Sequence, residues 1–238
     1  MTGTFLNVGT VVVGTLVGAV VGDRLPDRIR ETVLHVLGMF TLLVGVEAGL
    51  HAFRPPLSEL TRASVVIVLG SVLVGGILGE VIHIERGLDR LGDRLKARFG
   101  RGQARFTEGF VVASLVFCVG PLTVLGAVQD GLTGDFQLLA VKATLDGFAA
   151  LAFASALGWG VGFAAVTVLV YQGALSLSAA AATGVFTDVV VEAMTAAGGV
   201  IILGIGLRLL DLRRVRVGNL LPALLIAPVA FSLVERLA

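Results

Sequence analysis

Residues 138–158 read LLAVKATLDGFAALAFASALG, an apolar stretch that contains one lysine and one aspartate. As a helix, this stretch is long enough to cross the roughly 30 Å hydrocarbon core of a bilayer. Lys142 and Asp146 lie four residues apart, so they share one face of that helix. Charged residues at membrane depth cost free energy and usually face a bundle interior or a water-filled path. The stretch therefore predicts a membrane-spanning helix with a buried ion pair.

The rest of the chain is equally apolar. Of 238 residues, 56% are hydrophobic and 15% charged, and the mean hydropathy is +0.96, which excludes an ordinary soluble domain. Runs of about 20 apolar residues predict eight spans, at 4–22, 31–50, 62–82, 108–128, 138–157, 160–179, 186–207 and 217–234. We expect an all-α polytopic transmembrane helical bundle that forms a single membrane domain over 1–238. Its parts are the first three spans (1–82), an interfacial helix (84–99), the central spans (107–157) and the last three spans (160–238).

The distribution of basic residues predicts the orientation. The loops after spans one, three and seven hold 14 lysines and arginines, and the opposite loops and the C-terminal end hold 3. Because basic loops favour the cytoplasmic side, we expect these loops inside the cell and both termini outside.

Residues 84–99 predict a separate amphipathic helix. Apolar residues recur at helical spacing on one face, and arginines occupy another. We expect this helix to lie at the membrane interface and residues 84–105 to contact anionic lipid headgroups. The alternative is a gate or a partner-docking surface.

Two internal similarities suggest an inverted repeat. A shift of 161 residues places Asp27, Glu31, Gly38 and Gly45 on Asp188, Glu192, Gly199 and Gly206. Glu108-Gly109-Phe110 with Gly120 similarly matches Asp146-Gly147-Phe148 with Gly158. Both matches relate spans of opposite direction, and inverted repeats are typical of secondary transporters. In a glycine-rich chain such matches also arise by chance.

Signals for other functional classes are lacking. The sequence has no HExxH, P-loop or GxSxG motif and no cluster of metal ligands, so we expect neither an enzyme nor a metal or cofactor site. The single cysteine, Cys118, excludes an intrachain disulfide. No nucleic-acid partner is expected, and a homo-oligomer is compatible with the sequence.

Polar residues within or beside the spans predict a path for a solute. Lys142 and Asp146 form either a structural ion pair or an ion or proton site. Gly120-Pro121 either breaks or kinks the fourth span, and broken helices occur where they line a cavity or are buried in protein. The remaining candidates for the path are Glu108, Gln129, Asp130, Tyr171 and Gln172. Asn7 and Asn219 are expected to be structural.

Several strings resemble one known family. FTEGFVVASLVFCVGPLTVLGAVQDGLTGD (106–135), KATLDG (142–147), VYQG (170–173) and VGNLLPALLIAP (217–228) resemble the bacterial inner-membrane family that includes YdfK and YqgA, domain of unknown function 554. The likeness begins at residues 3–7 and continues to the last span. The family pattern leads us to expect a small or apolar residue at position 121, and Pro121 departs from it. The resemblance implies a multi-pass protein of the bacterial inner membrane and supplies no substrate.

The residues favour a transporter of a small solute or ion that works by alternating access, with Lys142 and Asp146 as its centre. The alternatives are an oligomeric ion channel, which uses the same polar residues without coupling, and a non-transporting scaffold or sensor, in which the ion pair is structural.

Overall fold

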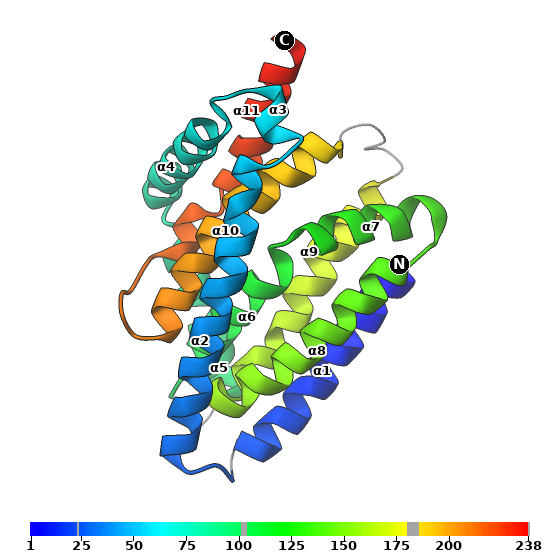
Figure 1. Ribbon diagram of the computed structural model, residues 1–238. Coiled ribbons are helices and arrows are strands. Elements are labelled where there is room, and N and C mark those ends of the chain that lie inside the picture. The colour runs from blue at the N-terminus through cyan, green and yellow to red at the C-terminus, as the bar shows by residue number, and fades with distance from the viewer. Residues whose placement is uncertain (23, 101–103, 180–185, 238) are drawn as a thin grey trace. The chain divides into compact units, whose positions relative to one another are not determined.

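The computed structural model describes residues 1–22, 24–100, 104–179 and 186–237, and its regular elements are all helical (Figure 1). Within these described ranges, seven segments are long and apolar enough to cross a membrane, and two helices joined at a bend make an eighth candidate. The chain is therefore an all-α polytopic helical bundle, as predicted. The longer helices are α1 (Thr2–Gly22), α2 (Asp27–Gly49), α4 (Ser64–Ile82), α5 (Ile84–Phe99), α6 (Phe106–Cys118), α7 (Pro121–Thr133), α8 (Gln137–Leu157), α9 (Ala164–Ser178), α10 (Asp188–Leu209) and α11 (Ala223–Leu237).

Short elements join several of these helices. They are η1 (Leu50–Phe53), α3 (Leu57–Leu60), η2 (Trp159–Phe163) and η3 (Val217–Leu220). The predicted amphipathic segment forms α5 with the expected bounds. The predicted fourth span is instead two helices, because α6 and α7 meet at a bend of 61°. Gly120 lies at this bend with a φ of +150°, a conformation that favours glycine.

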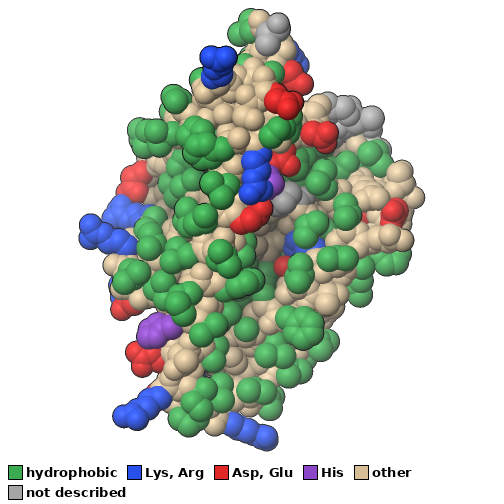
Figure 2. Space-filling model, viewed as in Figure 1, with side chains coloured by type: hydrophobic (Ala, Val, Ile, Leu, Met, Phe, Trp, Pro, Cys, Tyr) green, Lys and Arg blue, Asp and Glu red, His purple; other side chains and the backbone are tan. Residues whose placement is uncertain are grey.

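The chain divides into two compact units. Unit 1 comprises Met1–Leu37, Leu88–Cys118 and Leu122–Ala182, and unit 2 comprises Gly38–Gly87, Val119–Pro121 and Thr183–Ala238. The prediction of one membrane domain stays a prediction. On the face shown in Figure 2, hydrophobic side chains cover more of the surface than charged ones do, which is expected where helices face lipid rather than water.

Unit 1 is organised around the close packing of α1 against α8. A Cβ atom added at Gly14 or Gly18 would lie 2.2 Å from the carbonyl oxygen of Gly147 or Leu151, and one at Gly22 would lie 2.4 Å from that of Ser155. Only glycine fits these positions, and small residues at four-residue spacing let helices approach closely in lipid. Because the contacts advance together along both helices, α1 and α8 run parallel (Figure 1).

The parallel direction of α1 and α8 bears on whether the bent segment crosses the membrane. Three candidate spans, α2, α4 and the α6–α7 pair, separate these two helices. Two parallel spans must be separated by an odd number of crossings. If α2 and α4 each cross once, the α6–α7 pair would have to cross as well, as a broken span rather than as a re-entrant loop.

Unit 2 has α10 as its central helix, and 78% of the most apolar part of α10 is buried. The C-terminal part of α2, together with α4 and α11, packs around it. Close approach again depends on glycine: a Cβ added at Gly79 of α4 would lie 1.9 Å from the carbonyl oxygen of Asn219. The end of α4 is thereby held against η3.

The start of α5 is fixed within unit 2 by a buried carboxylate. The two oxygens of Glu85 accept hydrogen bonds from Arg208 Nη1 at 2.8 Å and from the backbone N–H of Gly218 at 2.6 Å. The backbone N–H of Glu85 donates to Asn219 Oδ1 at 2.7 Å. These bonds tie the first turn of the amphipathic helix to η3 and the end of α10.

Replacing Glu85 with Gln should loosen this first turn. The Gln side chain has one acceptor oxygen instead of two and no charge, so either Arg208 or the backbone N–H of Gly218 loses its acceptor and any remaining bond to Arg208 is weaker. We expect a loss of about 1–3 kcal/mol of local stability. Hydrogen exchange at residues 84–87 should accelerate, while exchange in α1 and α8 should not change. Asp89→Asn, which removes a charge from the same helix, is the control, and equal effects of both substitutions would contradict the anchoring role.

Candidate functional site

The buried face of α8 carries charge and its exposed face is apolar. Lys142 and Asp146 are 5% and 9% exposed, whereas Val141 and Leu145 are each 57% exposed and Phe148 is 70% exposed. This is the inverse of a helix on the surface of a soluble protein. The arrangement suits a lipid-facing helix whose polar groups turn toward other helices.

Three helices contribute to one hydrogen-bond network around this ion pair. Lys142 Nζ forms an ion pair with Asp146 Oδ2. From α1, Asn7 Nδ2 donates to the same carboxylate oxygen and to Gln172 Oε1 of α9, each at 3.0 Å. Gln172 Nε2 in turn donates to Thr4 Oγ1 at 3.1 Å. Asn7, Gln172 and Thr4 are each 0% exposed, so the network is sealed inside unit 1.

Asp130 forms a second polar position in unit 1. This residue of α7 is 3% exposed, and its Oδ2 lies 3.2 Å from the backbone nitrogen of Gly3 and 2.9 Å from the amino nitrogen of Met1. The next residue, Gly131, packs against the carbonyl oxygen of Ser176 on α9. Asp130 therefore lies where α7 meets α1 and α9, apart from the bonded network of Lys142 and Asp146.

Some buried oxygens in these helices have no bonding partner. Among the described side chains, Asn7 Oδ1, Asp130 Oδ1 and Ser176 Oγ are buried without a hydrogen bond. Buried polar atoms are usually satisfied, so each such atom calls for an explanation. The carbonyl and carboxylate oxygens are acceptors, and all three atoms suit a cation or a hydrogen-bond donor.

The structure does not bring the other predicted path residues into the network. Glu108 accepts two hydrogen bonds from Arg105, at 2.7 and 2.9 Å, at the start of α6. Gln129 donates to Asp135 at 2.8 Å, in the loop after α7. Tyr171 is partly buried and adjoins Gln172 in the chain. Of the predicted residues, only Lys142, Asp146 and Gln172 share bonded partners.

The sequence-based set omitted two members of the network. Thr4 was not considered, and Asn7 was assigned a structural role. The sequence did indicate that Asn7 has bonding partners, because its side-chain amide lies inside an apolar span and a buried amide needs hydrogen bonds. The partners themselves lie 139 and 165 residues away, so local sequence could not identify them.

Within the part of the chain that the structure describes, no group of three or more His, Cys, Asp and Glu side chains is placed to hold a metal ion. His51 in unit 2 does contact two carboxylates, Glu192 through Nδ1 and Glu47 through Nε2. Because the two contacts use different ring nitrogens, they do not form one shared coordination site.

Comparison with known proteins identifies the family but no activity. The chain is 29% identical over 235 residues to "Uncharacterized membrane protein YdfK" of Bacillus subtilis, covering 99% of this chain and 97% of that protein. It is also 29% identical over 230 residues to "Uncharacterized protein YqgA" of Escherichia coli, covering 94% of each. No solved structure matches the chain at a significant level. Residues 2–232 match the family described as "Protein of unknown function (DUF554)", and the chain therefore belongs to this family of membrane proteins.

Proposed function

We propose that the protein transports a small solute or ion across the bacterial inner membrane by alternating access. The observation that carries the proposal is the ion pair of Lys142 and Asp146, which is buried at the junction of α1, α8 and α9. Ionisable residues inside a membrane bundle are costly and typically mark pathways for ions, protons or substrates. The proposal includes no enzymatic step, metal or cofactor.

The network supplies groups that can exchange partners during a transport cycle. Asp146 Oδ2 receives bonds from both Lys142 and Asn7, and Asn7 also bonds to Gln172. Protonation of Asp146 would neutralise its charge and weaken its attraction for Lys142. Lys142 would then be free to bond elsewhere, which would favour one of two facing states. A bound solute or cation would act similarly through the unpartnered oxygen of Asn7, which is bonded to Asp146.

Contacts between α2 and α10 support the proposed inverted repeat. A Cβ added at Gly45 would meet Leu203, and one added at Gly206 would meet Leu42. The 161-residue shift places Gly45 on Gly206 and Leu42 on Leu203. The contact of Gly45 with Leu203 and the contact of Gly206 with Leu42 are therefore equivalent under the repeat. Such reciprocity is expected where two helices are related by a two-fold axis, as in transporters built from inverted repeats.

We also propose that the basic loops are cytoplasmic and that both termini lie outside the cytoplasm. The imbalance of 14 basic residues to 3 supports this orientation. The odd number of candidate spans between parallel α1 and α8 supports the span order that places the loops after spans one and three on the same side. The proposal can be checked with a membrane-impermeant thiol reagent. In a Cys118→Ala background, a cysteine at position 62 should be labelled from outside intact cells, and one at position 213 should not.

The test of transport is uptake and charge movement in proteoliposomes under an imposed pH gradient, with ions, amino acids and small organic acids as candidate substrates. We expect a signal with the wild type that is lost in a folded Lys142→Ala/Asp146→Ala variant. Glu235→Ala/Arg236→Ala, which removes an exposed pair of opposite charges, is the matched control. Equal uptake by all three proteins would contradict a transport centre at Lys142 and Asp146.

A scaffold or sensor is the second candidate, and one observation favours it. The carboxylate of Asp146 already has two donors, so the ion pair is satisfied without a solute. This reading is supported if the wild type is silent toward the panel and the double variant keeps the protein's cellular phenotype. A current that rises linearly with driving force, without accumulation, would instead indicate a channel.

A further inference from the structure

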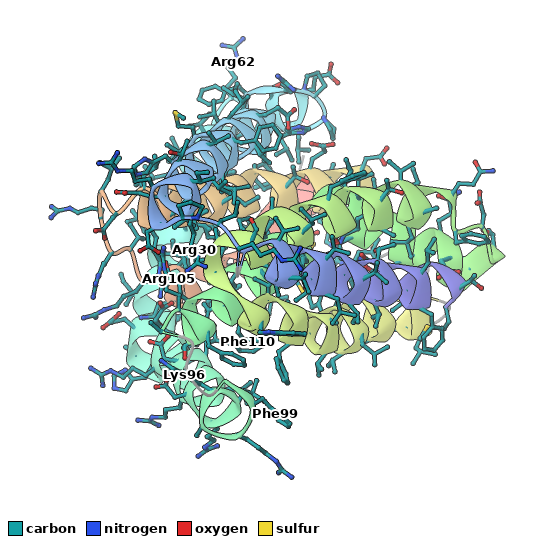
Figure 3. The ribbon with its side chains drawn as sticks, turned by 90° about the horizontal axis from the view of Figure 1, so that it is seen from below. Arg30, Arg62, Lys96, Phe99, Arg105 and Phe110 are labelled. Atoms are coloured by element: carbon teal, nitrogen blue, oxygen red, sulfur yellow. The ribbon has the colours of Figure 1, made fainter. Side chains whose placement is uncertain are left out.

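A cavity of about 310 Å³ lies in unit 1 where α1 and α8 end. Its lining includes Gly22 at the end of α1, residues 154–158 at the end of α8, and Ala104 just before α6. Two arginines, Arg30 and Arg105, also line it, and they lie beside each other at this end of the unit (Figure 3). The cavity shares no lining residue with the network around Lys142.

Arg30 has one N–H donor that no described residue accepts. Its Nη2 donates to the carbonyl oxygen of Gly22 at 2.7 Å, which satisfies an acceptor at the end of α1. Its Nε is buried and bonds to none of the described residues. A buried guanidinium N–H without an acceptor is unfavourable, so an acceptor oxygen from outside the protein would stabilise it.

Arg105 is oriented by Glu108. Its Nε and Nη2 both bond to that carboxylate, which fixes the plane of the guanidinium at the cavity wall and offsets its charge. The C-terminal ends of α1 and α8 also carry partial negative charge. The net positive potential in the cavity is therefore modest, and it suits a singly charged phosphate diester better than a dianion.

We propose that this cavity binds the phosphate group of a phospholipid headgroup, with Arg30 Nε as a principal donor. Arginine is well matched to phosphate oxygens, and basic pockets between transmembrane helices bind headgroups. The cavity lies at helix ends, where headgroups are found. The carbonyl oxygen of Ala154 accepts from the backbone N–H of Gly158 at 2.8 Å, whereas the carbonyl groups of residues 155–157 have no partner within α8 and would accept hydrogen bonds from an ammonium group such as that of ethanolamine. A free phosphate offers the same oxygens, so the experiment separates the two sources.

The first arm measures lipid retention by native mass spectrometry of the detergent-purified protein. We expect the wild type to keep one phospholipid and Arg30→Gln to show at least a tenfold lower occupancy. Arg28→Gln removes the same charge from an exposed position two residues away, and it should retain lipid like the wild type. Equal retention by the wild type and Arg30→Gln would overturn the lipid assignment.

The second arm titrates delipidated protein with glycerophosphoethanolamine and, separately, with inorganic phosphate by calorimetry. Ala104→Phe should fill the exposed side of the cavity while keeping both arginines, so it tests the site even if Arg30→Gln fails to fold. Loss of lipid retention or glycerophosphoethanolamine binding in Ala104→Phe supports the proposal. Binding of inorganic phosphate by the wild type alone, without retained lipid, would replace the lipid with a soluble ligand. No difference among the proteins in either arm would overturn the site.

Discussion

Lys142→Met should destabilise the protein by about 3–5 kcal/mol, because it leaves the Asp146 carboxylate buried without its cation. The carboxylate would keep only the bond from Asn7 Nδ2 at 3.0 Å. Replacing both partners, in Lys142→Met/Asp146→Leu, should restore most of the lost stability, because apolar residues of similar volume often substitute for a buried pair without loss. If the pair is the proposed transport centre, the double variant should fold and not transport solute.

Thermal unfolding in detergent measures these stabilities, and a double-mutant cycle with Asp146→Leu alone gives the coupling between the two residues. We expect both single variants to unfold at lower temperature than the double variant. If Lys142→Met were as stable as the wild type, the two side chains would not form a buried pair. If the double variant were stable and still transported solute, the pair would be structural and the transport centre would lie elsewhere.

Gly18→Leu should disrupt the packing of α1 against α8. Even a Cβ at this position would lie 2.2 Å from the carbonyl oxygen of Leu151, and this contact is with backbone that cannot rotate away. The helices would have to separate, and the bonds from Asn7 to Asp146 and Gln172 would lengthen or break. Overpacking alone typically costs about 1–3 kcal/mol, and we expect Gly18→Leu to exceed that range because the polar network is lost as well.

Gly9→Leu is the matched control, because nothing lies within 4 Å of a Cβ added there. It lies on the same helix and introduces the same side chain. We expect wild-type or slightly higher stability for it, since replacing a glycine within a helix favours the helix. Similar losses of folded protein for Gly9→Leu and Gly18→Leu, measured by size-exclusion chromatography and unfolding temperature, would contradict the close contact of α1 with α8.

The sequence predicted the helices well because each span is a local property of the chain. Apolar length placed the spans, and the periodicity of 84–99 placed α5 with its observed bounds. The bend in the fourth span was signalled by Gly120 and Pro121, although neither residue defines the angle between the two helices. Parallel packing of α1 against α8 was consistent with the predicted span order, but their contact could not be derived from it.

The network around the ion pair was only partly predictable. The spacing of Lys142 and Asp146 places them on one helix face, and polarity singled out Gln172. Periodicity identifies the face of a helix that is buried, but it does not say which other helix covers that face. Asn7 was therefore interpreted as structural, and Glu108 was included although Arg105, three residues away, satisfies it.

The pairing of α1 with α8 also has a consequence during synthesis. Asn7 emerges from the ribosome 139 residues before Asp146, which corresponds to roughly 7–28 s at about 5–20 residues per second. During that interval Thr4 and Asn7 have neither α8 nor α9 to bond with. The first helix must therefore reside in the insertion machinery or in lipid with its amide unpaired, and the polar interior of unit 1 is completed only after α9 has been made.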